Sequence, residues 1–254
     1  MVSIQALTKR YGPFVAVDGL SLEIGRGQLF GFLGPNGAGK TTTIKMLVGL
    51  LRPTSGRAAV TGHDVVTEPE AAKAAIGYVP DSATLYDKLT AREFLEFSGD
   101  LYHLDRPTRN RRIATLLGLF ELTPRADELL SAYSRGMRQK VSLAAALLHE
   151  PQVIFLDEPT VGLDPRSARL MKDILLDLCR DGRTVFVSTH ILEIAERMCS
   201  HIGIINQGRL VTAGPVAEIL HRDGGSESLE HVFLELTGSE AGEDIGPLLA
   251  ELER

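Results

Sequence analysis

The sequence has few cysteines, no long apolar run and no excess of basic residues. Cys179 and Cys199 lack the spacing of a metal site, so we expect them to be reduced, buried thiols in a cytoplasmic protein. No window reaches about 18 consecutive apolar residues, so no transmembrane helix is predicted. Residues 1–5 have neither a basic flank nor a long apolar core, so we expect no secretory signal. The formal net charge of −6 argues against a partner that is a nucleic acid, because proteins that bind nucleic acids usually present a basic face.

The composition and the order of the apolar runs predict one large α/β domain. The 254 residues are 44% hydrophobic and 24% charged, as in an ordinary soluble globular protein. Apolar strands alternate with helices, which favours a mostly parallel sheet covered on both faces. The expected strands cover residues 3–8, 14–24, 28–33, 57–60, 76–79, 153–156, 184–188, 201–206 and 209–213. The expected helices cover residues 43–50, 71–75, 165–180, 191–199, 229–236 and 245–252, with further helix starts at Thr90, Pro107 and Ser134.

Hydrophobic periodicity divides the chain further. A period near 3.6 dominates residues 85–148, which predicts a helical insertion. The polar run at residues 223–228 is typical of a linker. We therefore expect a main domain at residues 2–222 and a C-terminal segment at residues 223–254, made of the linker and short helices.

A glycine-rich loop follows the expected strand at residues 28–33 and precedes a helix. It fits the pattern of a glycine, four residues and Gly-Lys-Thr, in the strand–loop–helix context that this pattern requires. Its glycines let successive N–H groups point inward, and the helix N-terminus adds positive potential, so the loop predicts a site for a nucleoside triphosphate. We expect Lys40 to bridge the β- and γ-phosphates and the Thr41 hydroxyl to hold Mg²⁺. The loop consists of Gly34, Pro35, Asn36, Gly37, Ala38, Gly39, Lys40, Thr41 and Thr42.

Two acidic residues follow the expected strand at residues 153–156. A carboxylate at the C-terminal end of a parallel strand is able to reach the phosphate loop. Asp157 is suited to hold magnesium, directly or through another ligand, and Glu158 to polarise the water that attacks the γ-phosphate. An Asp-Glu pair also starts many solvated turns. The four apolar residues before the pair, in a chain with a phosphate loop, favour the catalytic interpretation.

Taken in order, these motifs resemble the ATP-binding cassette family, the nucleotide-binding domains of ABC transporters, over about residues 2–221. Residues 162–165, Gly-Leu-Asp-Pro, match the family's D-loop, and residues 188–190, Ser-Thr-His, match its switch histidine. The resemblance implies a P-loop NTPase (RecA-like) with a parallel sheet core, an N-terminal antiparallel β subdomain and an inserted α-helical subdomain. It also places Asp164 at the nucleotide.

The family's signature loop, usually Leu-Ser-Gly-Gly-Gln, is altered here. The matching residues 133–137 read Tyr-Ser-Arg-Gly-Met and keep only the serine and the second glycine. In this family the signature contacts the γ-phosphate of the nucleotide held by the opposite subunit. The resemblance therefore implies nucleotide contacts for Ser134, Arg135, Gly136 and Met137. A capped helix without a nucleotide is the simpler alternative.

Three further residues take roles that the resemblance implies. Asp81 stands where the family usually has a glutamine that touches magnesium and the attacking water, although a solvated turn aspartate would look the same. Tyr11 stands where an aromatic ring stacks on adenine. His190 stands where a histidine bonds the γ-phosphate, although a lone histidine after a strand is more often structural.

The resemblance implies the ATPase subunit of an ABC transporter, with ATP and Mg²⁺ as its cofactors. Two copies, or one copy and a similar ATPase subunit, are expected to pair head to tail around ATP, so that hydrolysis weakens the closed dimer. Transport would need separate integral membrane subunits docking near Leu85 to Leu104, which would hold the chain on the cytoplasmic face of the cell membrane. The signature and residues 85–90, Leu-Tyr-Asp-Lys-Leu-Thr, resemble ABC-2 type exporters, so export is expected.

Three alternatives compete with this interpretation. A soluble ATPase of the same fold acting on DNA or ribosomes usually has two cassettes, coiled coils or basic extensions. A kinase with the same loop would leave residues 134–137 and His190 unexplained. A regulatory nucleotide-binding subunit with feeble hydrolysis fits the departures at Asp81 and Arg135.

Overall fold

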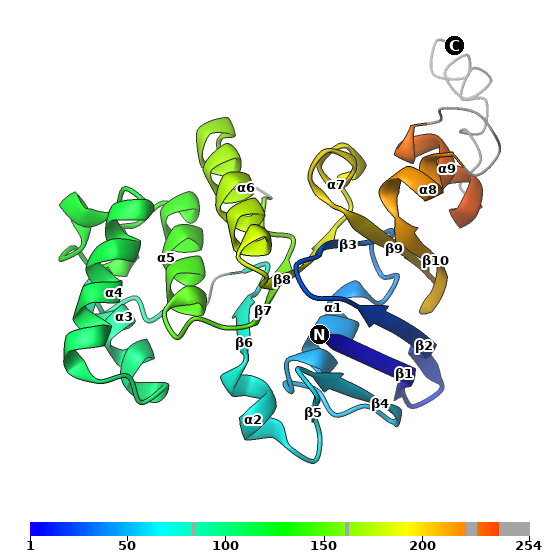
Figure 1. Cartoon of the computed structure of the whole chain (residues 1–254), viewed down its shortest axis with the longest axis horizontal. Coiled ribbons are helices and arrows are strands. Elements are labelled where there is room, and N and C mark those ends of the chain that lie inside the picture. Colours follow the sequence, from blue (N-terminus) through cyan, green and yellow to red (C-terminus); the bar gives the residue numbers. More distant parts are fainter. Residues whose placement is uncertain (83–84, 161–162, 222–227, 239–254) are drawn as a thin grey trace, which may run out of the picture.

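Two sheets organise the computed structural model, which describes residues 1–82, 85–160, 163–221 and 228–238 (Figure 1). The larger sheet has the strand order β10-β9-β3-β8-β7-β6, and the smaller has the order β2-β1-β4-β5. In the larger sheet every neighbouring pair is parallel except β10 and β9. In the smaller sheet every pair is antiparallel. The predicted parallel core and N-terminal antiparallel sheet are confirmed.

The elements have the following bounds. The larger sheet consists of β3 (Leu29–Leu33), β6 (Ile76–Val79), β7 (Val153–Asp157), β8 (Thr184–Thr189), β9 (His201–Asn206) and β10 (Arg209–Pro215). The smaller sheet consists of β1 (Val2–Tyr11), β2 (Phe14–Ile24), β4 (Ser55–Val60) and β5 (His63–Asp64). The described helices are α1 (Lys40–Leu47), α2 (Pro69–Ala74), α3 (Ala91–Leu101), α4 (Arg106–Leu119), α5 (Arg135–Leu147), α6 (Pro165–Arg180), α7 (Leu192–Met198), α8 (Val216–Leu220) and α9 (Leu229–Thr237), with 3₁₀ turns at Thr123–Arg125 and Leu130–Ala132.

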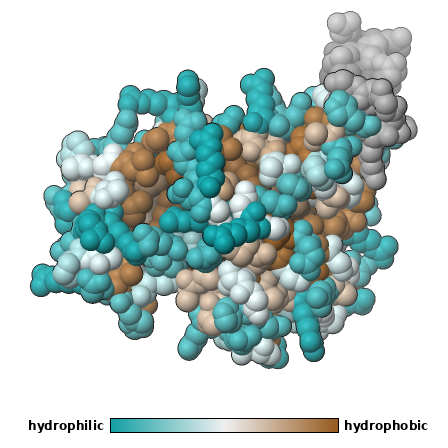
Figure 2. Space-filling view, in the orientation of Figure 1, coloured by the Kyte–Doolittle hydropathy of each residue, from teal (hydrophilic) through white to brown (hydrophobic). Residues whose placement is uncertain are grey.

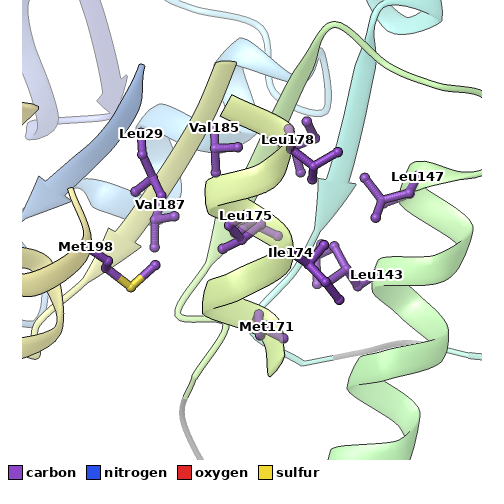
Figure 3. Close-up of a cluster of buried hydrophobic side chains, with 14 of the residues drawn as sticks. Leu29, Leu143, Leu147, Met171, Ile174, Leu175, Leu178, Val185, Val187 and Met198 are labelled. Carbon is purple, nitrogen blue, oxygen red and sulfur yellow. The ribbon is translucent and has the colours of Figure 1, made fainter. Parts of the chain in front are cut away.

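The central strands are apolar and buried on both faces, so alternate side chains enter two different cores. One core lies between the large sheet and helices that include α5 and α6. Leu29, Val185 and Val187 contribute to it from the strands (Figure 3). The other core lies on the side of α1 and the antiparallel sheet, and the rings of Phe32 and Phe186 pack there with centroids 5.3 Å apart. Burying each such side chain stabilises the fold by about 1.5–3 kcal/mol. This packing holds the strands in place, and with them the polar residues at their ends.

The helices α3, α4 and α5 lie together at one side of the large sheet (Figure 1). They occupy the chain between β6 and β7, as the predicted insertion requires. The side chains of Thr90, Asp105 and Ser134 cap the first turns of α3, α4 and α5. Hydrophobic residues gather on the face of the molecule where α5 and α6 lie near each other (Figure 2). Across the described ranges, no helix combines the length and the apolar character that crossing a bilayer demands.

The structure corrects several predicted boundaries. The first helix covers Lys40–Leu47 instead of residues 43–50, because Gly39 in the loop is its cap and Gly49, with φ of +70°, ends its last turn. The fourth helix begins at Arg106, one residue before Pro107. Cys199 is buried as expected, whereas Cys179 is only half-buried. The predicted helix at residues 245–252 and most of the predicted linker lie outside the described residues.

Candidate nucleotide site

The glycine-rich loop joins the C-terminal end of β3 to the start of α1. A side chain at Gly34 would place its Cβ 2.4 Å from the carbonyl oxygen of Ile205, and one at Gly39 would lie 2.6 Å from that of Ala16. Gly39 also has φ of +108°, a conformation that residues with a Cβ rarely adopt. These two glycines are therefore required by the packing of the loop as well as by its curvature.

Lys40 is turned back into the loop. Its Nζ donates to the carbonyl oxygens of Gly34, at 2.7 Å, and Pro35, at 3.2 Å. Only 7% of its side chain is exposed, and this burial lowers the pKa of Lys40 while the nearby Glu158 carboxylate opposes the shift. An ammonium group held against carbonyl oxygens in a partly dry site is well placed to take up phosphate oxygens.

A cavity of about 380 Å³ opens over the loop. Asp81 and Glu158 line it together with residues 35–42. Tyr11 and Phe14, which are 50% and 61% exposed, also line it. The structure thus brings most of the predicted phosphate-site residues around one cavity. The sequence interpretation missed Phe14, although an aromatic residue directly after the turn that follows Tyr11 is a signal that could have suggested it.

The acidic pair stands where β7 ends. Asp157 is 1% exposed, and its Oδ1 accepts a hydrogen bond from Ser188 Oγ at 2.5 Å. Glu158 has φ of +49°, a left-handed conformation that costs a residue with a side chain about 1–2 kcal/mol. Its N–H is bonded to the carbonyl oxygen of Ser188 at 3.1 Å and to Ser188 Oγ at 3.2 Å. The strained turn directs the Glu158 side chain toward the loop.

Glu158 meets two cationic or protonatable groups. Its Oε1 lies 3.6 Å from Lys40 Nζ and 3.0 Å from His190 Nδ1. The other oxygen, Oε2, is buried and has no hydrogen-bond partner within the part of the chain that the structure describes. A buried carboxylate oxygen without a donor is expensive to maintain, and it is suited to accept a hydrogen bond from water or substrate.

The signature residues form the start of α5 and lie outside the lining of this cavity. Ser134 Oγ accepts from the N–H of Met137 at 3.3 Å, so the simpler interpretation of a helix cap describes its observed contact. Arg135 lies 3.8 Å from Asp81 of the same chain, between two exposed side chains. Gly136 approaches Leu163, and Met137 Sδ accepts from an Arg125 guanidinium. Two of the residues that depart from the family pattern, Arg135 and Asp81, thus face each other.

Asp164 caps α6. Its carboxylate accepts from the N–H of Ser167 at 3.0 Å and from the Ser167 hydroxyl at 2.7 Å. These bonds lower the pKa of Asp164, the side-chain bond having the larger effect. Gly162 of the same motif falls outside the described residues.

The oxygen donors present fit a magnesium site that a nucleotide completes. No group of three or more His, Cys, Asp or Glu side chains able to hold a metal occurs among the described residues. Mg²⁺ commonly uses one or two protein oxygens together with phosphate oxygens and water. A hydroxyl such as that of Thr41 and the carboxylate of Asp157 match this requirement.

Comparison with known proteins identifies this arrangement. The family described as "ABC transporter" matches residues 17–161. The chain belongs to the ABC transporter family. It is 42% identical over 224 residues to the daunorubicin resistance ATP-binding protein DrrA3 of Streptomyces coeruleorubidus, a match that covers 88% of this chain and 71% of that protein. It is 38% identical over 230 residues to the linearmycin resistance ATP-binding protein LnrL of Bacillus subtilis, covering 91% and 74%.

Solved structures agree with this assignment. An ATP-binding subunit of an ABC transporter superposes with a TM-score of 0.88 at 32% identity, covering 93% of this chain and 99% of that one. The ATP-binding cassette MJ0796, in a dimeric post-hydrolysis state bound to ADP and Pi, superposes with a TM-score of 0.78 at 26% identity, covering 85% and 99%. The P-loop NTPase fold of ABC cassettes is confirmed, and the chain is an ATP-binding subunit with the ATPase activity of its family.

Proposed function

We propose that this chain supplies the ATP-driven step of an exporter whose membrane-spanning subunits are separate proteins. The observation that carries the proposal is the arrangement of Lys40, Glu158 and His190 around one carboxylate oxygen, beside the phosphate loop. The names of the two relatives, both resistance ATP-binding proteins, support export.

Each residue of the site takes a defined part in hydrolysis. Lys40 leaves the carbonyl oxygens of its own loop and binds phosphate oxygens, and Glu158 receives a proton from the attacking water at Oε2. His190 contacts the γ-phosphate and shares Glu158 Oε1 with Lys40. Thr41 and Asp157 would hold Mg²⁺, which neutralises phosphate charge when it is bound. We place adenine against Tyr11 and Phe14, whose rings offer a stacking surface.

We propose that the site is completed by a second subunit. The N-terminus of α5 carries Ser134 and the cation of Arg135, yet neither residue lines the cavity of its own chain. A helix N-terminus with an added positive charge attracts phosphate. In a head-to-tail pair this end of α5, with the D-loop residue Asp164, would face the nucleotide held by the partner. ATP then joins the two subunits, and its hydrolysis releases them.

A groove between the core and the helical region is our candidate for the membrane subunits. It is mostly apolar, and Lys73 is the only charged side chain among its lining residues in the described part of the chain. Residues 85–104 supply part of its wall, including Leu101, which is 62% exposed. Such a groove fits the apolar face of a short helix from a membrane protein. It would keep residues 2–222, as one ATPase domain, on the cytoplasmic face of the membrane, with residues 223–254 as an appendage.

Dimer formation tests the composite site. A Glu158→Gln protein with saturating ATP and Mg²⁺ should double its mass in light scattering, and addition of Arg135→Glu should prevent the doubling. Arg180→Glu in the Glu158→Gln background is the matched control, because Arg180 is an exposed arginine that pairs with Asp177 at the end of α6 opposite to Asp164. A monomer at saturating ATP, or equal effects of both charge reversals, would contradict the proposal.

The groove is tested with a pair of exposed leucines on neighbouring helices. Leu101→Asp should reduce the share of the chain that sediments with the membranes of its own cells, while leaving ATP binding unchanged. Leu119, which is 43% exposed on α4, lies outside the groove, so Leu119→Asp should have little effect. Equal sedimentation of the Leu101→Asp and unsubstituted proteins would rule out this docking surface.

A further inference from the structure

Ser188 joins the two acids of the site through one hydroxyl group. It lies on β8, where the register of the parallel pair sets it directly opposite Asp157. Its side chain is 0% exposed. Ser188 Oγ lies 2.5 Å from Asp157 Oδ1 and 3.2 Å from the nitrogen of Glu158.

The direction of both hydrogen bonds follows from the groups involved. An ionised carboxylate only accepts and a backbone N–H only donates, whereas a hydroxyl does both. The proton of Ser188 therefore goes to Asp157 Oδ1, and a lone pair of the same oxygen receives the N–H of Glu158. Because the Ser188 carbonyl oxygen also accepts from that N–H, one residue holds the left-handed turn at Glu158 from two sides.

We infer that Ser188 is a positioning residue for ATP hydrolysis. Its bond to Oδ1 fixes the rotation of the Asp157 carboxylate, so that the second oxygen keeps one direction toward the metal position. Its bond to the Glu158 N–H holds the turn that directs the Glu158 side chain to Lys40 and His190. A single hydroxyl thereby sets the spacing between the group that holds magnesium and the group that accepts the proton. This inference rests on the roles given above to Asp157 and Glu158.

The switch histidine directly follows the end of the same strand. His190 follows Ser188 by two residues, and its Nδ1 lies 3.0 Å from Glu158 Oε1. Glu158 is thus attached to the end of β8 at its backbone through Ser188 and at its side chain through His190. Loss of the Ser188 hydroxyl removes the hydrogen bond from the Glu158 N–H to Ser188 Oγ. The hydrogen bond from the same N–H to the Ser188 carbonyl oxygen stays in place.

The test compares two buried hydroxyls on one strand. Thr184 is also 0% exposed, and its Oγ1 donates to the carbonyl oxygen of Gly25 at 2.9 Å, at the other end of β8. Ser188→Ala and Thr184→Val each remove one buried hydroxyl, so a merely structural loss should affect both alike. For Ser188→Ala we expect kcat to fall about tenfold, less than the ~10²–10⁴-fold typical for losing the general base itself, with KM for ATP changed less than about twofold. Thr184→Val should keep kcat per folded molecule.

Nucleotide binding gives a readout apart from turnover. The dissociation constant of a fluorescent ATP analogue is measured with Mg²⁺ and with EDTA, and Ser188→Ala should reduce the gain in affinity that Mg²⁺ brings. Ser188→Cys keeps the shape of the side chain, with a slightly larger atom and a weaker donor. Its values should fall between those of serine and alanine, and it replaces the alanine variant if that variant does not fold. Unchanged kcat and unchanged Mg²⁺ dependence in Ser188→Ala, or an equal fall in Thr184→Val, would overturn the inference. Glu158→Gln serves as the reference. If this variant keeps full turnover, the role proposed for Glu158 in hydrolysis is wrong. If it is inactive while Ser188→Ala has normal turnover, only the role inferred for Ser188 is refuted.

Discussion

Replacing Glu158 with glutamine should separate ATP binding from ATP hydrolysis. The amide is the same size as the carboxylate and keeps an oxygen for Lys40 and His190, but it does not accept a proton at the position of Oε2. Loss of a general base typically costs about 10²–10⁴-fold in rate, equivalent to about 2.7–5.5 kcal/mol of transition-state stabilisation. We expect phosphate release to fall by that factor.

ATP affinity should rise in the same variant. The 3.6 Å between Lys40 Nζ and Glu158 Oε1 corresponds to an attraction of about 1 kcal/mol at the dielectric constant of water and about 5 kcal/mol at an effective value near 20. This attraction competes with the phosphates for Lys40, and the carboxylate also repels them. Even the screened end of the range predicts a dissociation constant about fivefold lower in Glu158→Gln.

The assay combines phosphate release with calorimetric titration of ATP. Glu121→Gln is the matched control, because Glu121 also has a left-handed φ, of +59°, and also pairs with a cation, Arg166. The control should change neither quantity appreciably. Undiminished turnover in Glu158→Gln would remove Glu158 from the role of general base, and weaker ATP binding would refute the competition for Lys40.

Three other predictions address the loop, the exposed ion pair and a half-buried histidine. Lys40→Ala should abolish ATP binding in calorimetry, and a retained affinity would refute the phosphate-loop assignment. A double-mutant cycle with Asp81→Asn and Arg135→Gln should give a coupling on unfolding free energy of no more than about 1 kcal/mol, because both side chains are exposed; a larger value would mean that the pair is shielded from solvent. Burial lowers the pKa of His149 from 6.5 to about 4, so the unfolded chain binds the proton first and stability should decrease as the pH falls through this interval. A single proton gives a slope of at most about 1.4 kcal/mol per pH unit, and the partial exposure of the ring lowers it further. Urea denaturation of His149→Gln should show a flatter pH dependence, and an unaltered profile would exclude His149 as the source.

The sequence predicted well whatever depends on local patterning. The strands at Phe14–Ile24, Ile76–Val79 and His201–Asn206 and the helix at Pro165–Arg180 have the predicted bounds, because apolar runs or helical periodicity end there at strong turn or cap signals. The phosphate loop was equally clear, since its glycines and lysine are contiguous. The two-residue strand β5 was missed because so short a segment has no periodicity to detect.

Two contacts between distant segments were not predicted from the sequence. The bond between Ser188 and Asp157 depends on the register of β7 against β8, and a slip by one residue would remove it. The approach of Arg135 to Asp81 depends on how the helical region packs against β6, since these residues are far apart along the chain. Motif matching identified Arg135 and Asp81 as departures from the family pattern, but it gave no indication that the two side chains lie near each other. Pairing of strands and packing of helices decide such contacts, and neither is encoded in a short window.

Helix α5 connects two parts of the molecule that have been treated separately. Its first residue, Arg135, stands beside Asp81, which lines the cavity over the phosphate loop, while Ser142, Ala145 and Ala146 form part of the groove wall. With 13 residues it is a rod about 20 Å long, so a tilt of about 5° around the groove end moves the nucleotide end by about 2 Å. An interface that forms or breaks at Arg135 would therefore also move the segment of α5 that lines the groove. For a partner in the proposed groove, this single rigid helix would be the direct link to the interface at Arg135.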